Sequence, residues 1–71
     1  VQIMSNWVES GNGLMVNPDP ILGGIIDKTI KTGEWFVIFH SELIPAIEGL
    51  ESKEKALQAF NDALESVYQL N

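Results

Sequence analysis

The most regular pattern in the sequence is helical and lies near its C-terminal end. Over residues 52 to 70, a helical wheel separates an apolar half from a polar half. Ser52 is placed to cap the helix, and Glu54 lies in the first turn, where the helix dipole favours a negative charge. The pattern therefore predicts an amphipathic helix over residues 52 to 70 whose apolar half is buried. That half consists of Ala56, Leu57, Ala59, Phe60, Ala63, Leu64, Val67, Tyr68 and Leu70.

Residues 34 to 40 predict the best-defined β-strand of the chain. Successive side chains of a strand point to opposite faces. One face would carry Trp35, Val37 and Phe39, and the other Phe36, Ile38 and His40. Both faces are apolar, which is typical of a central strand that is covered on two sides.

Three further segments predict strands, two before this one and one after it. Residues 1 to 8 mix β-branched and aromatic residues, with Val1, Ile3 and Trp7 on one face, and a glycine-containing turn then leads to the apolar residues 14 to 16. These two segments predict a hairpin. After a turn at residues 41 to 43, residues 44 to 49 can return as a partner strand. Because Pro45 cannot donate to a sheet, that strand must lie at an edge or start after the proline.

Residues 20 to 31 are ambiguous between helix and strand. Asp19 can cap free amides, Pro20 suits the first helical turn, and Gly33 is placed to end a helix. A wheel also gathers most of the apolar residues on one half. The alternative is a strand over residues 25 to 31, which are rich in β-branched residues, and Gly23-Gly24 would cost a helix about 1 kcal/mol each. The wheel and the end signals favour the helix.

The resulting element order is β-β-α-β-β-α, a small two-layer α+β domain with an antiparallel sheet and a long C-terminal amphipathic helix. With both helices on one face of the sheet, the second apolar face of residues 35 to 40 would stay open. Open apolar faces usually mark interfaces. The candidate interface residues are Trp35, Phe36, Val37, Ile38, Phe39 and His40. We expect self-association through the sheet.

Composition restricts the partners of this chain. At 71 residues it has the length of one domain, residues 1 to 71, and it contains no cysteine for a disulfide or a thiolate metal site. Ten acidic residues face four lysines, and the net charge of −6 with a pI near 4.4 opposes direct binding to nucleic acid. No apolar run approaches the roughly 20 residues of a membrane span. We expect a cytoplasmic domain that binds neither nucleic acid nor a membrane.

No motif in the sequence predicts catalysis, a cofactor or a metal. His40 is the only histidine, and a structural or surface role is the simpler interpretation of it. The glycines at 11, 13, 23 and 24 lack the lysine and serine or threonine of a phosphate loop and match no dinucleotide fingerprint. The acidic residues do not follow the spacing of a calcium loop. No serine is flanked by the glycines of a nucleophile elbow.

The stretch from Trp35 to Leu64 is similar to the hairpin-plus-helix units of many small modules, including integrase-type DNA-binding domains. This sequence lacks the basic residues that such domains carry on their sheet, so the resemblance does not extend to DNA binding.

Three hypotheses about function follow. The leading one is a non-enzymatic protein-interaction or regulatory domain that acts as a homo-oligomer. The alternative is an acidic inhibitor that mimics nucleic acid and occupies a basic cleft of a partner. The third is a small enzyme or ligand binder, which would need a closed pocket that holds His40 beside a carboxylate.

Overall fold

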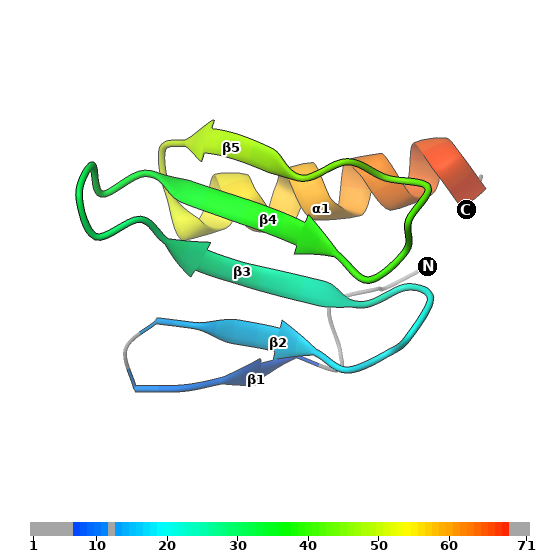
Figure 1. Cartoon of the computed structure of the whole chain (residues 1–71), viewed down its shortest axis with the longest axis horizontal. Helices are drawn as coiled ribbons and strands as arrows, with labels where there is room; N and C mark the ends of the chain where they lie inside the picture. Colours follow the sequence, from blue (N-terminus) through cyan, green and yellow to red (C-terminus); the bar gives the residue numbers. More distant parts are fainter. Residues whose placement is uncertain (1–6, 12, 69–71) are drawn as a thin grey trace.

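The computed structural model describes residues 7–11 and 13–68, which form an antiparallel sheet followed by a helix (Figure 1). The strands are β1 Val8–Glu9, β2 Met15–Asn17, β3 Gly24–Lys28, β4 Trp35–Phe39 and β5 Ile47–Leu50, and the helix is α1 Lys53–Tyr68. Each strand pairs with its neighbour in the chain, so the order across the sheet is β1-β2-β3-β4-β5. This described part of the chain is therefore a meander whose final helix lies against one face.

The hydrophobic core lies between α1 and that face of the sheet. Helix α1 contributes Ala56, Phe60 and Leu64, which are fully buried. Phe60 stacks on Phe39 of β4, with the ring centroids 5.0 Å apart, and meets the ring of Trp7 edge-on at 4.9 Å. The sheet supplies Met15, Ile26, Val37 and Phe39, and Ile44 joins them from the loop before β5.

The prediction of a helix within residues 20 to 31 is wrong, and with it the order β-β-α-β-β-α. Residues 20 to 22 form a turn, and Gly24–Lys28 is the middle strand of the sheet, paired with β2 on one side and β4 on the other. Asp19 does cap free amides, but they are the amides of Ile21 and Leu22 in this turn. Gly33 has the expected positive φ of 74°, but in the turn between β3 and β4. The alternative of a strand is therefore correct in type, but the strand is Gly24–Lys28 rather than residues 25 to 31, and residues 29 to 31 belong to the turn that follows.

The structure confirms a C-terminal helix and a strand within residues 34 to 40. Two details are wrong: Val67, on the apolar half predicted to be buried, is 42% exposed, and β4 is covered on one face rather than two, since Ile38 is exposed. The hydroxyl of Ser52 accepts a hydrogen bond from the amide of Lys55 at 3.2 Å, which is the expected N-cap. Strand β4 lies within the predicted residues 34 to 40, and β5 begins after Pro45 at an edge of the sheet. The predicted first hairpin is present as β1 and β2, whereas Val1, Ile3 and residues 69 to 71 lie outside the described part of the chain.

Candidate interaction surface

The face of the sheet that points away from α1 carries a row of aliphatic side chains. Register pairs Val8 of β1 with Val16 of β2, Val16 with Ile25 of β3, and Ile25 with Ile38 of β4. Residues directly opposite each other in antiparallel strands lie on the same face. These four β-branched residues, Val8, Val16, Ile25 and Ile38, therefore form one line across four strands, which we call the aliphatic row. Val8 and Ile38, at its two ends, are 65% and 44% exposed.

The strand alternation explains why this row is uncovered. On β3, Gly24 and Ile26 are buried toward α1 while Ile25 between them is half-buried. On β4, Val37 and Phe39 are buried toward α1, and Ile38 is exposed. The one helix of the described residues, α1, covers the face of Val37 and Phe39, so the opposite face is left without a helix, as the sequence predicts. We call the uncovered side the open face.

Two acidic residues lie on the open face. Glu48 of β5 follows Ile47, which pairs with Val37 of the core face, so Glu48 lies on the open face at the edge of the sheet. The other is Asp27, beside the aliphatic row. Asp27 pairs with Phe36 across β3 and β4, two residues along each strand from Ile25 and Ile38. The side chain of Asp27 is half-buried, and its Oδ1 accepts a hydrogen bond from the amide of Lys28 at 2.8 Å. This bond satisfies part of the carboxylate locally, so the apolar row can remain dry while Asp27 lies at its margin.

His40 lies at the opposite margin of the open face, where β4 ends. Its Nδ1 donates to the backbone oxygen of Asp19 at 2.9 Å, and its amide donates to the oxygen of Gly23 at 3.1 Å. The amides of Leu22 and Ile21 donate to the Asp19 carboxylate and hold the pKa of that group below its ordinary value. His40 therefore has a structural contact that ties the turn before β3 to the end of β4.

The structure divides the six candidate interface residues between the two faces. Trp35, Val37 and Phe39 belong to the side that packs on α1, and Phe36, Ile38 and His40 to the open face. Sequence reasoning misses the other members of the aliphatic row, Val8, Val16 and Ile25. The helical wheel places Ile25 on a helix that does not form. The alignment of Val8 with Val16 depends on the register of a hairpin, which a single sequence does not reveal.

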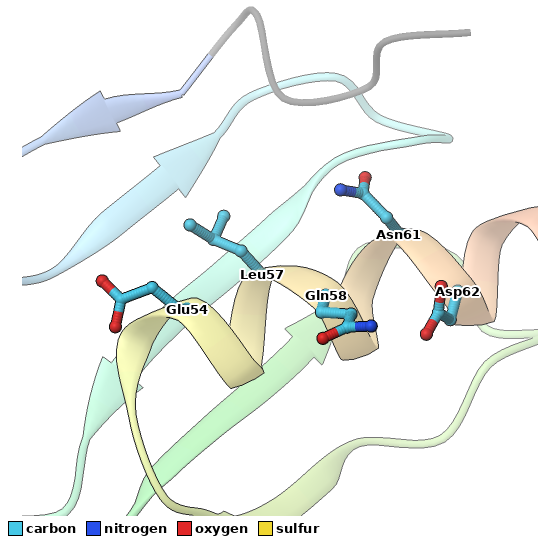
Figure 2. A pocket seen from close by; sticks show the side chains of 5 residues that line it. All are labelled: Glu54, Leu57, Gln58, Asn61 and Asp62. Atoms are coloured by element: carbon cyan, nitrogen blue, oxygen red, sulfur yellow. The ribbon is translucent and has the colours of Figure 1, made fainter.

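A shallow depression of about 330 Å³ lies along one side of α1 (Figure 2). The described residues that line it all come from this helix: Glu54, Leu57, Gln58, Asn61 and Asp62. Neither His40 nor any hydroxyl group is among them. Two carboxylates, two amides and one leucine offer no nucleophile with an adjacent base, so this arrangement does not match a catalytic site. This depression is therefore not the predicted sign of an enzyme, which is a closed pocket that holds His40 beside a carboxylate.

Metal clusters and membrane spans are absent from the described residues. No three or more His, Asp or Glu side chains there are grouped so that they could hold a metal ion. None of the helices in that part of the chain is both long and apolar enough to span a membrane.

Two buried polar atoms have no hydrogen-bond partner among the described residues. They are Nε1 of Trp7 and Oδ1 of Asn61, and the structure offers no explanation for the missing partner of either atom.

Comparison with known proteins returned no matching family model, no matching curated protein and no matching solved structure.

Proposed function

We propose that this domain is a non-enzymatic protein-interaction module and that its binding surface is the open face of the sheet. The observation that carries the proposal is the aliphatic row of Val8, Val16, Ile25 and Ile38, which crosses four strands on the face away from α1. The largest exposed apolar patch of a monomeric protein is often a functional site. Phe36, beside the row, adds an aromatic side chain of the type that dominates binding energy at interfaces.

The edges of the sheet are poor alternatives to the face. A partner strand needs a run of free backbone groups, but β1 is two residues long. At the other edge, Pro45 precedes β5, and the register between β4 and β5 is shifted beside Gly49, whose φ is 73°. Short strands, prolines and bulges are the features that protect sheet edges from pairing. This supports binding through the face.

The nucleic-acid mimic has less support, because several acids already have partners within the molecule. Lys53 pairs with Glu9, backbone amides bind the Asp19 carboxylate, and the Lys28 amide binds Asp27. A mimic needs carboxylates that are free to replace phosphates. We therefore propose binding by apolar contact rather than by charge.

A selection from a random peptide library tests the proposed surface and requires no identified partner. Peptides selected on the immobilised domain would be measured by fluorescence anisotropy against the parent protein and three variants. Ile38→Glu places a charge on the aliphatic row. Ile30→Glu makes the same change at a hairpin tip, where Ile30 is 99% exposed, and Gln58→Glu introduces the charge in the depression on α1.

We expect apolar peptides whose affinity falls at least about tenfold with Ile38→Glu, because a charge within an apolar contact must be desolvated. Affinity for Ile30→Glu and Gln58→Glu should stay within about twofold of the parent. Peptides that bind all variants equally, or that lose affinity with Gln58→Glu alone, would contradict the proposal. Basic peptides whose binding collapses between 50 and 300 mM salt would favour the mimic instead.

A further inference from the structure

We draw no further inference here: the strongest candidate, the shallow depression along one side of α1 that Leu57 lines between Glu54 and Asp62, rests on an acidic stretch of a single helix, and nothing in the structure shows what ligand would fill it.

Discussion

Replacing Phe60 by alanine is the most direct perturbation of the core between α1 and the sheet. Phe60 has no exposed surface, and its ring contacts the rings of both Phe39 and Trp7. Truncation of a buried phenylalanine costs about 3–5 kcal/mol. Because Phe60 loses two ring contacts at once, we expect the upper end of that range. A domain of this length has a free energy of unfolding of about 4–11 kcal/mol in total.

Urea unfolding followed by circular dichroism measures this loss. Val67→Ala is the matched control, because Val67 lies on the same helix but is 42% exposed, and it should lose less than about 1 kcal/mol. If Phe60→Ala is unfolded without urea, Phe60→Leu keeps an apolar side chain, and we expect it to lose about 1–2 kcal/mol. The account of the core is refuted if Phe60→Ala and Val67→Ala unfold at the same urea concentration.

Two further predictions concern the strand that sequence patterns assign to a helix and the turn before it. Gly24→Ala should lose about 1–3 kcal/mol, because the new methyl carbon would lie 2.4 Å from the backbone oxygen of Ile38 and 2.8 Å from the ring of Phe60. Gly11→Ala should be close to neutral, because its new methyl carbon would meet nothing within 4 Å. Thermal unfolding of both variants measures the difference, and equal losses of stability for Gly24→Ala and Gly11→Ala would argue against this packing. Because two backbone amides lower the pKa of Asp19, its carboxylate stabilises the fold above its ordinary pKa, and this contribution is lost as the pH falls through the lower value. Unfolding measured between pH 2 and 7 should therefore show a smaller loss of stability below about pH 4 for Asp19→Ala than for the parent, and identical pH profiles would contradict the assignment.

The failed helix prediction shows where local signals stop being informative. Asp19 and Gly33 do what their residue types suggest, since one caps free amides and the other takes a positive φ. Both roles serve turns as well as helix ends. What decides the element is the space around Gly23 and Gly24, where side chains would lie within 3 Å of other backbone atoms. This close approach between strands and loop is a tertiary property, which helix wheels do not contain.

The open face could be predicted in part. Alternation along residues 34 to 40 is sufficient to place Phe36, Ile38 and His40 opposite the core face of β4, because a strand has a fixed period of two. The aliphatic row could not be predicted, because it depends on which residues of four strands are paired. Pairing is set by turn geometry and by burial against α1, neither of which one sequence specifies.

The central claim is that this protein works through the open face of its sheet, and nuclear magnetic resonance during a peptide titration tests it most directly. Amide shifts of the parent protein would be recorded as a peptide selected on the immobilised domain is added, and the titration would be repeated with Ile38→Glu. We expect the shifts to change at Val8, Val16, Ile25 and Ile38, and these changes to be lost in the variant. Shift changes concentrated along α1, around Leu57 and Asn61, would contradict the claim.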